Sequence, residues 1–185
     1  MLILTADPTN IHWGYYSPSL APVADVDPGA VVLLQDVPRV DPKVVADSGV
    51  VSSDKIPDNH WRIFSEVKDR GPGAHIMVGP VYVNGAEPGD TLEVRILEVE
   101  LAYDYGYHYQ SPIGGVLAEE TTQEWRRIFR IDRDRRAAEV AKGIWVSCAR
   151  PFFGNIGVAP HSGPISSNVP GNHGGNLDNK ELFNL

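Results

Sequence analysis

The chain has 185 residues, with 24 acidic and 16 basic side chains and hence a net charge of −8. Such an acidic chain offers no basic surface to a phosphate backbone or to an anionic membrane, which argues against both as partners. Its single cysteine excludes an internal disulfide framework and a cysteine-based zinc finger, and fits a reducing, cytoplasmic setting. No run approaches the roughly 20 apolar residues that cross a bilayer.

The first half of the chain reads as short elements separated by turns. Its 18 glycines and 15 prolines, spread over the whole sequence, break long helices and favour short strands. The apolar run 30–34 follows a turn signal at Asp27-Pro28-Gly29 and is predicted to be a strand. Residues 38–58 are mixed and predicted to be irregular, with one short helix near 42–47. Residues 77–84 are predicted to form a β run.

The second half contains one alternating segment, one ambiguous segment and one polar loop. Apolar and charged residues alternate in 91–101, which predicts a half-buried strand with Leu92 and Val94 facing the core. Residues 124–148 would tolerate a helix, but their β-branched residues fit a hairpin better. Residues 150–179 are rich in Gly, Pro, Asn and His, and a long polar loop of this kind is usually functional.

The strongest chemical signal in that loop is a glycine-framed set of donors: His173, Asn176 and Asp178. Glycines let the backbone approach a ligand closely. A histidine and a carboxylate together suit zinc or a similar divalent ion. The alternative is a tight structural loop, because Asn, Asp and Gly are also common turn formers.

Two further histidines lie in short glycine-rich or aromatic motifs. His12 precedes Trp13, and His75 follows Gly71-Pro72-Gly73-Ala74. Each has a structural alternative: His12 as a packed, hydrogen-bonded side chain, and His75 as a residue that closes a turn. Neither has a metal-ligand spacing such as His-Glu-x-x-His. A joint site with His173 requires the fold to bring them together.

Taken together, these motifs resemble the acetamidase/formamidase family, in the family's order and over nearly the whole chain. The motifs that carry the resemblance are residues 12–15 with 21–23 and 27–29, residues 79–83 with 85–92, residues 150–160, and residues 173–182. Family members continue beyond the position of Leu185, so the resemblance indicates an N-terminal portion of the family domain over residues 1–185.

The resemblance implies a mostly-β fold of β-sandwich or barrel-like form, incomplete at its C-terminus. It implies hydrolysis of short aliphatic amides, such as formamide or acetamide, by water activated at a divalent metal ion, expected to be zinc. It also implies a homodimer. Asp178, His173 and His75 are the expected metal ligands, and His12 and Asn176 are the expected catalytic residues that orient water or substrate.

Two other functions remain open. A catalytically inactive truncated β module, or a small-ligand binder, would share the motifs without turnover. A metal-binding jelly roll that performs other chemistry would bind metal without hydrolysing amides.

Overall fold

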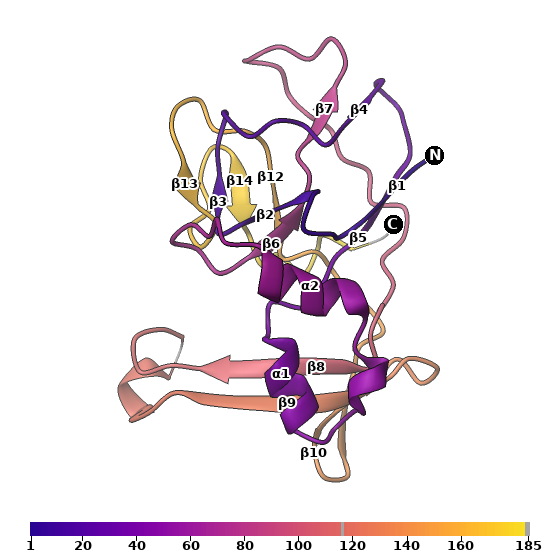
Figure 1. Ribbon diagram of the computed structural model, residues 1–185, viewed down its shortest axis with the longest axis vertical. Helices are drawn as coiled ribbons and strands as arrows, with labels where there is room; N and C mark the ends of the chain where they lie inside the picture. Colours follow the sequence, from indigo (N-terminus) through magenta and orange to yellow (C-terminus); the bar gives the residue numbers. More distant parts are fainter. Residues whose placement is uncertain (116, 184–185) are drawn as a thin grey trace. The chain divides into compact units, whose positions relative to one another are not determined.

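The computed structural model describes residues 1–115 and 117–183 (Figure 1). Its backbone divides into two compact units, each built from segments far apart in the sequence. Unit 1 comprises Met1–Arg39, Pro57–Glu100 and Pro151–Leu185, and unit 2 comprises Val40–Ile56 and Leu101–Arg150. All the histidines and carboxylates predicted to carry chemistry lie in unit 1.

Unit 1 is a set of short paired strands. The parallel pairs are β1 (Leu2–Thr5) with β5 (Val32–Gln35) and β4 (Ala24–Val26) with β7 (Val81–Val83). The antiparallel pairs are β2 (Ile11–Trp13) with β6 (Ile76–Val78), β3 (Tyr15–Tyr16) with β13 (Ile165–Ser166), and β12 (Asn155–Gly157) with β14 (Gly174–Asn176). The buried side chains of β2, β3 and β6 form the part of the core that underlies the candidate site.

Helix α2 (Asp58–Glu66) belongs to unit 1 and buries one of its faces. It begins after the extended residue Pro57, and Asp58 places a negative charge in the first turn, where the helix dipole favours it. His60 and Ile63, three residues apart and therefore on one face, are completely buried. No helix was predicted over these residues.

The opposite end of α2 is closed by Arg70. Its guanidinium donates to the carbonyl oxygens of Phe64 (2.7 Å) and Val67 (3.0 Å), which have no partner within the helix. The same group lies 3.9 Å from the centroid of the Trp13 ring, a cation–π contact. One side chain therefore joins the helix end to strand β2.

Replacing Arg70 by Ala is expected to lower the free energy of unfolding by about 1–2 kcal/mol, since two capping bonds and the cation–π contact are lost together. Urea denaturation measures the change. Lys180→Ala is the control, because the Lys180 side chain is 82% exposed and should leave the midpoint unchanged. Equal midpoints for Arg70→Ala and the wild type would contradict this role.

Unit 2 contains a four-stranded antiparallel sheet in the order β11–β10–β9–β8. Its strands are β8 (Tyr105–Gln110), β9 (Trp125–Asp132), β10 (Ala137–Ala141) and β11 (Ile144–Ser147). The unit also holds helix α1 (Pro42–Asp47), whose first turn is capped by the Asp41 carboxylate and whose Val45 is completely buried. Two 3₁₀ turns, Ser53–Lys55 and Ala118–Glu120, complete it.

Several expectations are confirmed. The structure is mostly β, although none of the sheets formed by the described residues closes into a barrel. The strand expected at 30–34 is β5, the short helix near 42–47 is α1, and the segment 124–148 forms the β9–β10 hairpin with β11 added. The β run at 77–84 is split between β6 and β7 by Gly79-Pro80. In the part of the chain that the structure describes, no helix is long and apolar enough to span a membrane.

The prediction of a strand at residues 91–101 is wrong. The structure assigns no strand to these residues, and Leu92 and Val94, expected on the core face, are 51% and 54% exposed. The alternating pattern has the period of a half-buried strand, but a strand also requires a neighbour to complete its hydrogen bonds. Among the described residues, no backbone hydrogen bond joins 91–100 to another segment.

Candidate functional site

Three distant segments of unit 1 meet at Gly14. Its carbonyl oxygen accepts from the backbone N–H groups of Gly73 (2.8 Å) and Ser167 (3.0 Å), and its own N–H donates to the carbonyl of His75 (2.8 Å). A side chain at Gly14 would place its Cβ 2.6 Å from the Gly73 oxygen. This close backbone junction fixes His12, His75 and Ser167 on one framework.

His12 lies on β2 and is buried, and its ring Nδ1 lies 3.2 Å from the carbonyl oxygen of Gly79. Because a carbonyl oxygen only accepts, Nδ1 must carry the hydrogen. Burial lowers the pKa of His12 from 6.5, against a smaller raising effect of the Gly79 bond. The ring is therefore neutral at pH 7, with an unprotonated lone pair on Nε2.

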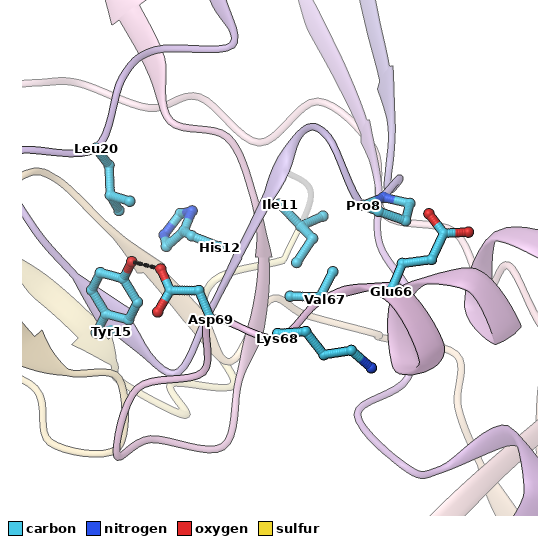
Figure 2. Close-up of a pocket in the computed structure, with 9 residues that line it drawn as sticks. All are labelled: Pro8, Ile11, His12, Tyr15, Leu20, Glu66, Val67, Lys68 and Asp69. Atoms are coloured by element: carbon cyan, nitrogen blue, oxygen red, sulfur yellow. Dashed lines mark hydrogen bonds between the residues drawn. The ribbon is translucent and has the colours of Figure 1, made fainter.

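His12 also lines a pocket of about 250 Å³ (Figure 2). Figure 2 shows His12, Tyr15, Leu20 and Asp69 grouped at one end of this pocket. The Tyr15 hydroxyl donates to Asp69 Oδ2 at 2.6 Å. The remaining lining residues are Pro8, Ile11, Glu66, Val67 and Lys68. The volume is slightly below the range of about 300–1,000 Å³ typical of drug-sized ligands, so the pocket suits a small molecule.

Tyr16 connects His12 to His173. The Tyr16 ring makes edge-to-face contacts with both imidazoles, at centroid distances of 5.9 Å to His12 and 5.0 Å to His173. Burial raises the pKa of Tyr16 to about 12, so the hydroxyl remains protonated and donates to Asn155 Oδ1. The Asn155 amide donates in turn to the Ser167 carbonyl (3.1 Å).

Sequence reasoning missed Tyr16 and Asn155 as site residues. Both lie beside or within motifs that carry the family resemblance, at 12–15 and 150–160, and that proximity was the only available signal.

His173 is buried immediately before β14. Its Nε2 has no hydrogen-bond partner among the described residues. A Cβ on Gly175 would come within 2.9 Å of this nitrogen, and Gly175 has a φ of +95°, so a glycine is required there on both counts. Burying a nitrogen without a hydrogen-bond partner costs free energy unless a ligand or a water molecule binds to it. Nε2 of His173 is therefore a candidate ligand atom for a metal ion or a substrate.

His75 is fixed by Ser167. His75 Nδ1 lies 3.1 Å from the Ser167 hydroxyl. Burial lowers the pKa of His75. The charge of Arg39 adds to this lowering, and the charge of Asp178 opposes it. Asp178 has a φ of +44° and its N–H donates to the Gly154 carbonyl (2.9 Å), which holds it in place.

Asn176 is held in place by a hydrogen bond of its own. Its side-chain amide donates to the Asn168 carbonyl (3.2 Å), so its observed bond fastens β14 to the loop after β13. The structure thus brings His12 and His173 together around Tyr16. Among the described residues, no hydrogen bond or ion pair joins His75 to Asp178.

The expected metal ligands, Asp178, His173 and His75, do not form a metal site as they are placed. Within residues 1–115 and 117–183, no group of three His, Cys, Asp or Glu side chains is placed so that it could hold a metal ion. The donor types at His75, Asp178 and His173, and the unpartnered Nε2 of His173, nevertheless fit a divalent ion chemically.

The contribution of His12 and His75 to the free energy of unfolding is expected to fall as the pH is lowered below about 6.5. The folded state depresses the pKa of His12 and His75, so the unfolded chain binds more protons as the pH falls, and protonation favours unfolding. Urea midpoints at pH 8, 7, 6 and 5 measure the effect. His12→Gln should flatten the profile, while the exposed His161→Gln should retain it. Identical profiles for all three proteins would contradict the burial argument.

These observations define a mostly-β protein with a small pocket, a neutral buried histidine on its wall and a second histidine, His75, on the same backbone framework. A family model described as the acetamidase/formamidase family matches residues 6–172. The chain belongs to the acetamidase/formamidase family.

Solved structures agree with this assignment. An acetamidase from Bacillus halodurans is 26% identical with a TM-score of 0.70, and the match covers 99% of this chain and 55% of that one. A predicted acetamidase/formamidase from Thermoanaerobacter tengcongensis shares the fold at 22% identity and a TM-score of 0.72, and the match covers 98% of this chain and 54% of that one. An acetamidase from Yersinia enterocolitica shares it at 23% identity and a TM-score of 0.64, with 98% of this chain and 53% of that one covered. The chain spans about half the length of these solved relatives. No curated protein matches it significantly.

Proposed function

We propose that this chain hydrolyses short aliphatic amides, such as formamide and acetamide, to the carboxylic acid and ammonia. The observation that carries the proposal is the tautomer of His12: the hydrogen on Nδ1 is engaged by the Gly79 carbonyl, which leaves Nε2 as a base. This base lines a pocket suited to a small molecule, in a member of the acetamidase/formamidase family.

The steps assigned to His12 are two proton transfers. Nε2 accepts a proton from the attacking water as the water oxygen bonds to the amide carbonyl carbon. The imidazolium then returns that proton to the amide nitrogen as the C–N bond breaks, because the amine leaves poorly as an anion. Water and amide are consumed, acid and ammonia are released, and His12 returns to its neutral form.

The surrounding residues keep His12 ready for this role. Burial keeps the imidazole neutral, so Nε2 is able to accept a proton, and the Gly79 bond fixes the ring orientation. The edge contact of Tyr16 limits ring motion from the other side. Tyr15 and Asp69 place a polar pair at the same end of the pocket, where an amide would require hydrogen-bond partners.

A divalent ion, expected to be zinc, completes the proposal. Asp178, His75 and His173 are the residues that would hold it, and Asn176 would orient water or substrate, as the family resemblance implies. When bound, such an ion would polarise the amide carbonyl and lower the pKa of water. We also propose that the chain forms a homodimer and acts in the cytoplasm.

The proposal is tested by ammonia release from formamide and acetamide by the purified chain, after chelation and with added zinc. We expect release that depends on the metal, and expect Asp178→Ala to reduce both bound zinc and ammonia. Binding of acetamide by a folded chain that releases no ammonia would contradict the proposal and favour the small-ligand binder.

A further inference from the structure

One carboxylate on the wall of the His12 pocket has an oxygen that no described residue uses. Asp69 lines the pocket, and Figure 2 shows it grouped with His12, Tyr15 and Leu20 at one end. Its Oδ2 accepts the Tyr15 hydroxyl at 2.6 Å. Among the described residues, its Oδ1 accepts no hydrogen bond and no cation pairs with the carboxylate. Asp69 therefore presents a negatively charged acceptor at the same end of the pocket as the base.

The two other charged side chains of the pocket wall are engaged with neighbouring residues. Glu66 pairs with Arg62, whose Nε lies 3.1 Å from Glu66 Oε1. The Lys68 ammonium donates to the carbonyl oxygen of Ser65. In Figure 2 both side chains extend away from Asp69. The charge that a small ligand meets at this end of the pocket is thus the charge of Asp69.

The fold holds the Asp69 carboxylate in place. The backbone N–H of Gly71 donates to the Trp13 carbonyl oxygen (2.8 Å), which ties this loop to β2. A Cβ at Gly71 would lie 2.6 Å from Cδ1 of the Tyr15 ring, so only a glycine lets the loop and the ring pack this closely. The hydrogen bond to Asp69, then burial, then the Asp69 charge raise the pKa of Tyr15 above its ordinary value, so its hydroxyl stays a donor.

The free oxygen of Asp69 discriminates between small molecules of one size. A carboxylate accepts hydrogen bonds and donates none, so it favours a ligand that carries N–H groups. The NH₂ group of an unsubstituted amide meets this requirement, whereas a ketone or an ester of the same size offers no donor. A carboxylic acid in its ionised form brings a second negative charge, and an unpaired like charge opposes its binding.

We propose that Asp69 is the residue by which the pocket selects unsubstituted amides and rejects carboxylates, and that Tyr15 is the residue that positions it. The inference rests on the proposed amide hydrolysis and names its substrate class, small amides that retain their N–H hydrogens. Oδ1 accepts one N–H of the amide. The acid formed by hydrolysis is an anion, so Asp69 also favours its release.

Binding of acetamide, acetone and acetate tests the proposal. These molecules are nearly equal in size and differ in the group on the carbonyl carbon, which is NH₂, CH₃ or O⁻. NMR titration of the ¹⁵N-labelled chain without added metal measures each Kd. We expect the wild type to bind acetamide roughly tenfold more tightly than acetone or acetate, a modest ratio because Asp69 is exposed.

Two variants separate the charge of Asp69 from its position. Asp69→Asn removes the charge and keeps an accepting oxygen, so acetamide should bind within about threefold of the wild type and acetate roughly tenfold more tightly than it does to the wild type. Tyr15→Phe keeps the ring against Gly71 and releases the carboxylate, which should reduce the preference for acetamide over acetone by about threefold. Asp25→Asn is the matched control, because Asp25 is an exposed aspartate of unit 1 on β4, away from the pocket lining. Its three Kd values should equal those of the wild type.

Equal discrimination by Asp69→Asn and the wild type would overturn the proposal. So would a wild-type chain that binds acetone as tightly as acetamide, or that binds none of the three molecules. The proposed hydrolysis fails on a different result, which is selective binding of acetamide through Asp69 without release of ammonia. Ammonia release that acetate inhibits equally in the wild type and in Asp69→Asn would do the reverse, supporting hydrolysis and overturning the role of Asp69.

Discussion

Replacing His12 by Gln is expected to lower kcat/KM for formamide and acetamide by about 10²–10⁴-fold, the range typical of losing a general base. A glutamine side chain can still donate a hydrogen bond to the Gly79 carbonyl, but it has no group that accepts a proton at neutral pH. The loss should fall mainly on kcat, because proton transfer rather than substrate binding is removed.

The control for this prediction is His161→Gln, which removes an exposed histidine in the same unit and should retain full activity. Urea denaturation at pH 8 shows whether His12→Gln is folded. A folded His12→Gln protein with activity within threefold of the wild type would rule out His12 as the base.

Replacing Gly73 by Ala is expected to cost roughly 3 kcal/mol or more of unfolding free energy, at the upper end for overpacking. A Cβ at this position would collide with the Gly14 carbonyl oxygen and the Ser167 hydroxyl, and would lie 2.7 Å from the Ser167 backbone nitrogen. Two of these atoms are backbone atoms in the junction that carries His12 and His75, so they cannot move aside without distorting the backbone.

Gly114→Ala is the matched control for this steric argument. Apart from its chain neighbours, no atom of the described residues lies within 4 Å of the position that its Cβ would occupy. Its urea midpoint should stay at the wild-type value. If Gly73→Ala were as stable as Gly114→Ala, the backbone around Gly73 would have room for a Cβ, contrary to this prediction.

Local sequence patterns predicted the elements whose start or composition is marked by a few neighbouring residues. Asp41 followed by Pro42 marks the start of α1, and the β-branched residues of 124–148 mark the β9–β10 hairpin. The segment 91–101 carries an equally clear local signal, but pairing depends on a neighbour that no described residue provides. Periodicity indicates how a strand would bury its side chains and cannot show whether it has a partner.

The candidate site was predictable as a set of residue types but not as a geometry. Short motifs singled out His12, His75 and His173, and all three lie in unit 1. The bond that defines the His12 tautomer joins residues 67 positions apart, and the Tyr16–Asn155 bond joins residues 139 positions apart. Interactions over such separations depend on the folded backbone, so no local pattern could have revealed them.

The proposed role of His12 depends on the protonation state and tautomer of its ring, and ¹⁵N NMR of labelled histidines measures both directly. The His12 signals are assigned by their loss in His12→Gln. We predict the tautomer with the hydrogen on Nδ1, a lone pair on Nε2, and a pKa below 6.5. A hydrogen on Nε2 at neutral pH, or a pKa above 6.5, would contradict the assignment of His12 as the base of this site.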